Sequence, residues 1–221
     1  ATGRTWLEGW LISLRNRGGT DIGRRRGERH ERQRILIVTE GTETEPQYFR
    51  GLASYARATG LSVFPADIYG KGRDPRRVVE DAIRRRDADR ACAERDQYDG
   101  VWCVFDVDQH NSLPAAVTLA RKESISVAIS NPCFELWLLL HFVDHFAEID
   151  STELCRRLSR HGCTGKGIPK SFAYSNHSNA ARRAGLSYTS NDQYEIPPNP
   201  GTTVQLATSL LVSSPPSDSS R

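Results

Sequence analysis

The chain has 221 residues, 38% of them hydrophobic and 26% charged, which fits one compact domain with an appendage. No apolar run approaches the roughly eighteen residues of a spanning helix, and Glu8 interrupts the apolar stretch at residues 6–12. We therefore expect a cytoplasmic protein with neither a membrane span nor a secretory leader. The net charge of +3 does not by itself indicate nucleic-acid binding.

The five cysteines form no CxxC pair, and their odd number argues against a closed set of disulfides. We expect reduced thiols. A zinc site built from Cys155, His161 and Cys163 is an alternative, but it lacks a fourth ligand.

Arginines are concentrated in a short stretch near the N-terminus and on a predicted helix. They are Arg24, Arg25, Arg26, Arg29, Arg32 and Arg34, and then Arg73, Arg76, Arg77, Arg84, Arg85 and Arg86. Because the guanidinium fork matches phosphate oxygens, these arginines predict contacts with a nucleic-acid backbone. A solvated tail and a solvated helix face are the alternative.

The first predicted strand is residues 35–39, a β-branched run typical of a strand buried on both faces. It ends at Glu40 and Gly41. A helix should follow, with Thr44 as its N-cap, Gln47 closing a capping box, and Gly60 ending it.

Residues 61–69 contain Pro65 and predict a short strand or an edge strand. A helix from Pro75 should turn its arginines to water. Residues 101–105 are a third buried strand, and it runs into Asp106 and Asp108. A helix at 113–122 and a strand at 126–130 complete the pattern.

Strands that alternate with helices predict an α/β fold, a Rossmann-like central parallel sheet flanked by helices. Both acidic clusters follow the carboxyl ends of strands. Open parallel sheets place their sites at that edge.

Residues 134–142 are apolar nearly all round and predict a buried helix. A glutamate buried there, Glu135, would have a raised pKa unless paired or metal-bound, which makes it a further candidate catalytic residue. A satisfied ion pair is the alternative. His141 and His145 could face one metal from this helix, although histidines so placed are more often structural.

The remaining chain is predicted to be mostly helical, at 151–161, near 180–184 and at 202–211, with irregular residues 187–200. Lys166 and Lys170 lie in a glycine-bearing loop and are candidates for phosphate contacts. The predicted divisions are a basic N-terminal segment (1–33), a core (34–145), a mostly helical C-terminal extension (146–212) and a disordered tail (213–221).

Glu40, Asp106 and Asp108 would repel one another at one sheet edge unless a cation enters. Carboxylates suit Mg²⁺ or Mn²⁺, which would also bind a substrate phosphate, and Gly41 would let that phosphate come close. A phosphatase of the haloacid dehalogenase type would want its Asp-x-Asp on the first strand, so that alternative is weaker. The acids could also simply cap loops and helices.

Four segments together resemble the RloB family, over roughly residues 24–212. They are residues 35–49 (ILIVTEGTETEPQYF), 101–108 (VWCVFDVD), 131–141 (NPCFELWLLLH) and 199–204 (NPGTTV). That family is similar to Toprim domains, is found in prokaryotic restriction and phage-defence loci, and is often encoded beside an ATPase. The resemblance implies a Toprim-like core with Glu40 as general acid/base and Asp106 and Asp108 as metal ligands. Members often carry lysine where this chain has Glu43, which puts a phosphate contact at that position in doubt.

The sequence thus predicts a Mg²⁺-dependent (or Mn²⁺-dependent) Toprim-type nuclease, the effector of an anti-phage, abortive-infection system. It would cleave phosphodiester bonds in RNA, with tRNA among the candidates, or in DNA. The predicted catalytic residues are Glu40, Asp106, Asp108 and Glu135, and the predicted nucleic-acid contacts are Arg24, Arg25, Arg26, Arg76, Arg77, Lys166 and Lys170.

The alternative is a non-catalytic Toprim-like subunit that binds nucleic acid or regulates a partner ATPase. No Walker-type loop is present in the sequence, so nucleotide hydrolysis would come from a separately encoded ATPase. The oligomeric state stays open, with a homo-oligomer among the options.

Overall fold

The computed structural model describes residues 34–63, 66–71, 74–90, 97–107, 111–190 and 192–213. Several predictions therefore lie outside the described residues. They concern the basic segment 1–33 with Arg24, Arg25 and Arg26, the metal ligand Asp108, and the tail from residue 214.

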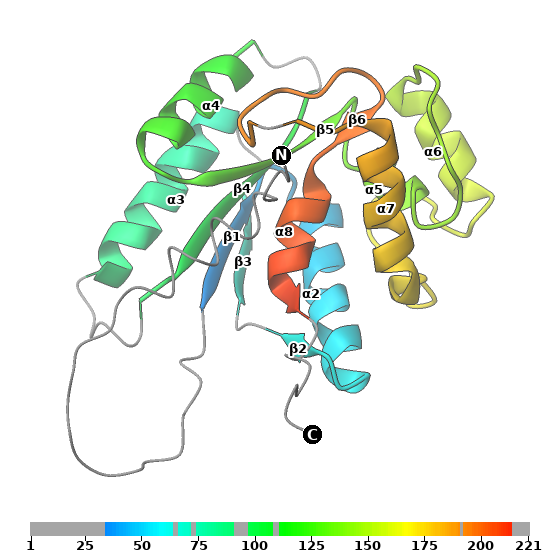
Figure 1. The fold of residues 1–221 in the computed structure, drawn as a ribbon, viewed down its shortest axis with the longest axis horizontal. Coiled ribbons are helices and arrows are strands. Elements are labelled where there is room, and N and C mark those ends of the chain that lie inside the picture. Colours follow the sequence, from blue (N-terminus) through cyan, green and yellow to red (C-terminus); the bar gives the residue numbers. More distant parts are fainter. Residues whose placement is uncertain are drawn as a thin grey trace, which may run out of the picture. The chain divides into compact units, whose positions relative to one another are not determined.

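A five-stranded sheet forms the centre of the described fold (Figure 1). Its order is β3 (Ala66–Gly70), β1 (Ile35–Thr39), β4 (Gly100–Asp106), β5 (Ser126–Asn131) and β6 (Gly201–Thr202). The first four strands run parallel, and β6 pairs antiparallel with β5. The predicted α/β, Rossmann-like fold is confirmed.

Helices cover both faces of this sheet, which explains why β1 and β4 are apolar at almost every position. α3 (Pro75–Arg90) and α4 (Leu113–Lys122) pack on one face, where Leu36 and Val38 point. Alternate residues of a strand face opposite sides, so Ile35 and Ile37 point to the other face. α2 (Thr44–Ala58) and α8 (Val204–Leu211) cover that face (Figure 1).

The remaining elements are short and lie mostly between β5 and β6. They are α5 (Glu135–Leu139), α6 (Ser151–Ser159), η2 (Tyr174–Asn176) and α7 (His177–Ser187). A separate antiparallel pair joins β2 (Ser62–Val63) to β7 (Val212–Ser213). None of the helices in the described ranges is long and apolar enough to cross a membrane.

Several predicted elements are confirmed with nearly the predicted bounds, among them β1, α4 and β5. The strand predicted at 61–69 is instead two strands, β2 and β3, of which β3 is an edge strand as expected. The extension predicted at 146–212 contributes β6 to the central sheet, and this strand was not predicted. The division at residue 145 stays a prediction.

The start of α2 differs from the prediction. Glu43, not Thr44, occupies the N-cap position, and no side chain caps the helix there. Gln47 does not close a capping box, because its Oε1 instead accepts a hydrogen bond from the backbone N–H of Ile168 at 2.9 Å. A long-range contact has replaced the predicted local one.

The buried helix predicted at 134–142 is much shorter, since α5 ends at Leu139. His141 lies in the following turn, where its Nδ1 is 3.0 Å from the Trp137 carbonyl oxygen and its Nε2 is 3.1 Å from the Tyr48 hydroxyl. His145 lies further along, outside any helix, with its Nδ1 3.1 Å from an Arg157 nitrogen. The two histidines have different partners, which agrees with the favoured structural role and not with the alternative of one shared metal.

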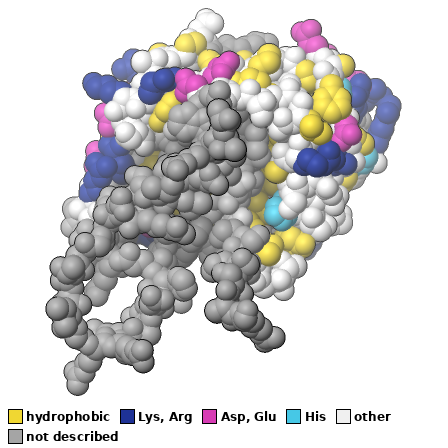
Figure 2. Space-filling model, viewed as in Figure 1, with side chains coloured by type: hydrophobic (Ala, Val, Ile, Leu, Met, Phe, Trp, Pro, Cys, Tyr) yellow, Lys and Arg dark blue, Asp and Glu magenta, His cyan; other side chains and the backbone are white. Residues whose placement is uncertain are grey.

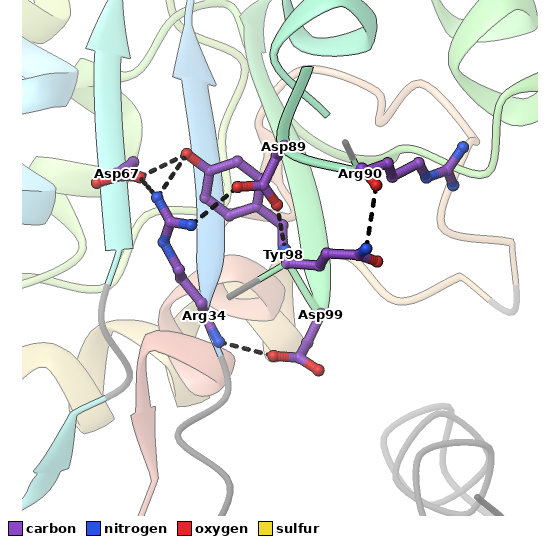
Figure 3. A network of polar contacts seen from close by, with 7 residues as sticks. Arg34, Asp67, Asp89, Arg90, Tyr98 and Asp99 are labelled. Carbon is purple, nitrogen blue, oxygen red and sulfur yellow. Dashed lines mark hydrogen bonds and ion pairs between the residues drawn. The ribbon is translucent and has the colours of Figure 1, made fainter. Parts of the chain in front are cut away.

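Two arginines predicted to face water or phosphate are held by the protein itself. Arg86 is buried, and its guanidinium donates to the carbonyl oxygen and the carboxylate of Glu123 at the end of α4. Arg34 forms ion pairs with Asp67 on β3 and Asp89 on α3, at 2.6 and 2.8 Å, and stacks on the Tyr98 ring (Figure 3). Both arginines therefore have partners within the fold. For Arg34 these ion pairs favour a structural role over the predicted phosphate contact, which stays a prediction.

Candidate active site

The order of the strands creates a switch point between β1 and β4. The chain leaves β1 for β3 on one side and later returns to β4 on the other. In open parallel sheets of this kind, ligands bind in the crevice outside the carboxyl ends of the strands at such a point. Glu40 directly follows β1, and Asp106 is the last residue of β4.

Hydrogen bonds at this edge hold both positions in the sheet. The backbone N–H of Glu40 donates to the Val104 carbonyl oxygen at 3.1 Å, so β1 stays paired with β4 up to the carboxylate. Asp106 is in register with Ser130 on β5, and the next amide, that of Val107, donates to the Ser130 carbonyl oxygen. The two acids thus emerge from neighbouring strands.

Asp106 lies in an electrostatic environment that disfavours its charge. Burial raises the pKa of Asp106 well above its usual range, and repulsion from Glu45, Glu135 and Glu40 raises it further. A hydrogen bond from the Phe134 backbone opposes the shift. The charged groups that contribute most are all carboxylates, so Asp106 lies within electrostatic reach of three other acids.

Glu45 is the member of this cluster that the sequence did not identify. It is buried in the first turn of α2, and its Oε1 accepts a hydrogen bond from the Gly41 N–H at 2.9 Å. Burial raises the pKa of its carboxyl group. A Cβ at Gly41 would lie 2.1 Å from Glu45 Oε2, so the glycine makes room for this carboxylate. The Glu45 carboxylate, and not a phosphate as predicted, occupies the space beside Gly41. The signal that could have found Glu45 is its place one helical turn after Gly41.

Glu135 is the first residue of α5 and is only half-buried, so the predicted full burial is wrong. The helix carries its apolar residues from Leu136 onward into the core, while Glu135 repels the charge of Asp106. Cys133, just before it, is buried, and burial followed by repulsion from Glu135 raises the pKa of its thiol.

The donor chemistry of the cluster fits a hard divalent cation. Carboxylate oxygens are the preferred ligands of Mg²⁺, and the buried Asp106 Oδ1 has no hydrogen-bond partner in the described part of the chain. Within the described ranges, however, no three acidic, histidine or cysteine side chains are grouped closely enough to hold a metal ion. Asp108, the third expected ligand, lies outside those ranges.

The same absence of a metal-holding group among the described residues overturns the zinc alternative, since all three of its residues are described. Cys163 is buried, Cys155 is exposed, and His161 stacks on Phe142 with ring centroids 4.5 Å apart. The cysteines described are free thiols, as expected.

The described residues predicted to contact nucleic acid, Arg76, Arg77, Lys166 and Lys170, are all exposed and lie on two separate elements. Arg76 pairs with Glu80 on α3 at 3.2 Å, while Arg77 lines a hollow of the same helix. Lys166 and Lys170 lie in the loop after α6, which Gln47 holds through Ile168. Figure 2 shows Lys and Arg side chains along the α3–α4 side and again over α6.

Comparison with known proteins gives one match. The sequence model of the family described as RloB-like protein matches residues 35–211, which include every described carboxylate of the cluster. Neither the curated proteins nor the solved structures contain a match to this chain.

Proposed function

This chain belongs to the RloB family, and from that premise we propose that it is a divalent-metal-dependent nuclease of the Toprim type, which cuts phosphodiester bonds in RNA or DNA. We further propose that it acts in the cytoplasm as the effector of an anti-phage, abortive-infection system. The observation that carries the proposal is the cluster of Glu40, Glu45, Asp106 and Glu135 at the switch point of the sheet.

The cluster supports this chemistry because its carboxylates repel one another when no cation is bound. Four carboxylates that share one edge raise the pKa of Asp106, and a divalent cation would relieve that repulsion. Glu40, Asp106 and Asp108 would hold the Mg²⁺ or Mn²⁺. A bound ion of this kind would polarise a phosphodiester and neutralise the charge that develops on it.

The chain's own groups have separate tasks in this proposal. Glu40, at the tip of β1, exchanges a proton with the attacking or leaving oxygen. The Phe134 N–H orients the carboxylate of Asp106. Glu45 holds the Gly41 amide and so fixes the backbone turn that directs Glu40.

Single-turnover cleavage tests the proposal. With Mg²⁺ and mixed RNA and DNA substrates, we expect Glu40→Gln to bind nucleic acid like wild type and to cleave about a hundred- to ten-thousandfold more slowly. Asp106→Asn should lose both cleavage and the Mg²⁺-dependent part of binding. Glu43→Gln is the matched control, because Glu43 is an exposed glutamate three residues after Glu40. This variant should cleave at the wild-type rate. Wild-type cleavage by folded Glu40→Gln would refute the mechanism.

Metal uptake is a separate test. Calorimetry with Mn²⁺ should give a binding signal for wild type that an Asp106→Asn/Asp108→Asn variant lacks. Identical uptake by both proteins would place any metal site elsewhere.

The second candidate is a Toprim-like subunit without turnover that binds nucleic acid or regulates a separately encoded ATPase. It is favoured by one observation, namely that the described carboxylates do not by themselves form a metal-holding group. Sequencing of nucleic acid from cells that express the protein distinguishes the two. New cut ends that vanish with Glu40→Gln support the nuclease, and intact nucleic acid with a co-purifying ATPase supports the subunit.

A further inference from the structure

A hollow of about 240 Å³ is lined by Lys71, which follows β3, and by residues 77–84 of α3. Its lining is almost entirely charged, and consists of Lys71, Arg77, Glu80, Asp81 and Arg84. An open, charged hollow of this size suits a small charged group better than an apolar ligand.

Cations outnumber carboxylates in this hollow. Asp81 forms ion pairs with two lining cations, Lys71 at 2.9 Å and Arg84 at 2.6 Å, and with Arg85 outside the lining at 2.6 Å. These cations lower the pKa of Asp81 to about 2, although burial opposes the shift. Glu80 is paired with Arg76 from outside the hollow. Both carboxylates of the lining are therefore already neutralised by ion pairs.

Arg77 is the lining cation for which the described residues offer no carboxylate in ion-pair contact. Its side chain is exposed. The nearby Asp74, at the start of α3, accepts hydrogen bonds from the Arg76 amide and the Ser112 hydroxyl. Arg85 is fixed beneath the hollow by Asp81 and by the Tyr69 ring, 3.6 Å from its guanidinium carbon. The result is a preformed set of cations with one guanidinium available to an anion.

The hollow is adjacent to the acidic cluster. The Lys71 N–H donates to the carbonyl oxygen of Thr39 at 3.1 Å, and Thr39 immediately precedes Glu40. Because neighbouring strands lie about 4.8 Å apart, the backbones of Lys71 and Glu40 leave the sheet side by side. A polymer of phosphates that reached Glu40 would pass close to this hollow.

We propose that the hollow lined by Lys71, Arg77 and Arg84 binds a backbone phosphate of the nucleic-acid strand, next to the phosphate that the acidic cluster handles. The proposal rests on the proposed function for its choice of a nucleic acid as the phosphate source. Arg77 supplies the direct contact, and Lys71 and Arg84 supply the surrounding positive field while they remain bound to Asp81. The contact is independent of base sequence.

The test compares Arg77→Ala with Arg90→Ala in the full chain. Arg90 is an exposed residue at the other end of the same helix, so both variants lose one charge. Binding of a labelled single-stranded oligonucleotide is measured without divalent cations, so that no cleavage occurs. We expect Arg77→Ala to bind about five- to tenfold more weakly and to lower the slope of log affinity against log salt by roughly 0.7, the value for one single-strand phosphate contact.

Arg90→Ala should keep the wild-type affinity and slope. The proposal is overturned if the two variants have equal effects. It is also overturned if Arg77→Ala leaves the oligonucleotide affinity unchanged. Inorganic phosphate and a mononucleotide are tested as competitors to identify the phosphate source. If Arg77→Ala abolishes their binding but leaves oligonucleotide binding unchanged, the hollow takes a free phosphate compound and the proposal is wrong.

The outcome is distinguishable from failure of the proposed function. If oligonucleotide binding depends on Arg77 but the protein never cleaves, the phosphate-binding role of the hollow is supported and the nuclease function is refuted. Cleavage by a chain in which Arg77→Ala and Arg90→Ala bind alike supports the nuclease and refutes the hollow. A chain that binds no oligonucleotide at all refutes the hollow outright.

Discussion

Gln47 and Ile168 are joined by a hydrogen bond of 2.9 Å although 121 residues separate them in the chain. Gln47 belongs to the first turn of α2, two residues after Glu45, and Ile168 follows the loop residues Lys166 and Gly167. Gly167 has φ +107°, and a Cβ added to it would lie 3.0 Å from Gln47 Oε1. The contact therefore fixes the lysine loop against the helix that carries part of the acidic cluster.

We expect Gln47→Ala to loosen this loop without unfolding the protein. The loss of one exposed hydrogen bond should cost about 1 kcal/mol or less. Hydrogen exchange of the amides in residues 164–170 should become faster, and nucleic-acid binding should weaken if Lys166 and Lys170 contact phosphate. Gln97→Ala is the control, since Gln97 also bonds to a backbone carbonyl, that of Arg90, at the other sheet edge. Unchanged exchange in 164–170 would contradict the prediction.

Gly41→Ala should displace the buried carboxylate of Glu45, because the new Cβ would lie 2.1 Å from its Oε2. We expect a loss of stability of roughly 1–3 kcal/mol and a strong loss of cleavage. The control is Gly185→Ala on α7, where no atom lies within 4 Å of an added Cβ. That change should stabilise the protein by roughly 0.5–1 kcal/mol. Chemical denaturation measures both, and a Gly41→Ala protein as stable and active as wild type would be incompatible with this packing.

Acid should destabilise the fold through His141. This residue is fully buried, and burial lowers its pKa from 6.5 to about 4. Between these pH values His141 is protonated in the unfolded chain but neutral in the folded chain. The free energy of unfolding therefore falls as pH drops from about 6.5 to 4. The loss is about 3 kcal/mol at 1.36 kcal/mol per pKa unit. Below pH 4 this contribution changes no further.

Denaturant titrations from pH 7 to 4 measure that fall, and His141→Gln should make it shallower. Because the variant also loses a bond to Tyr48, an NMR titration of wild type provides a second readout. A His141 resonance that titrates near pH 6.5 would disprove the prediction.

Arg34→Ala should reduce stability but leave nucleic-acid binding unchanged. The side chain holds Asp67 and Asp89 at the amino-terminal edge of the sheet, opposite the acidic cluster (Figure 3). We expect a loss of roughly 1–3 kcal/mol, and a melting temperature lower by about 2–4 °C for each kcal/mol. Arg57→Ala, which removes an exposed arginine at the end of α2, should alter neither property measurably. A reduced salt slope for Arg34→Ala would revive its role as a phosphate contact.

The parts of the fold predicted well from sequence are those in which local pattern and burial agree. The run at 35–39 is apolar on both faces and is buried on both. The helix at 113–122 has an apolar stripe and basic residues in its last turn. Glu40 and Asp106 could be named because each directly follows such a strand.

Other features depend on partners far along the chain, and local pattern could not reveal them. The apolar run after Glu135 suggested a long helix, but His141 bonds to Trp137 and Tyr48 where the chain turns. In sequence Arg86 does not differ from the neighbouring arginines. Its buried role depends on the hydrogen bond to Glu123, 37 residues along the chain. In sequence Glu45 is an ordinary acidic residue in the first turn of a helix. Its hydrogen bond with the Gly41 amide is visible only in the fold.

The pairing of β5 with β6, and of β2 with β7, has a consequence for synthesis on the ribosome. The partners of Ser130 and Val63 are Thr202 and Val212, so these pairs close only after nearly the whole described chain has emerged. Long-range pairing of this kind slows folding. The sheet edge beside Asp106 thus stays incomplete during translation, and a nascent chain would carry the acidic residues without the finished scaffold that holds them. Any activity that needs this scaffold would then arise only after β6 has emerged and paired with β5.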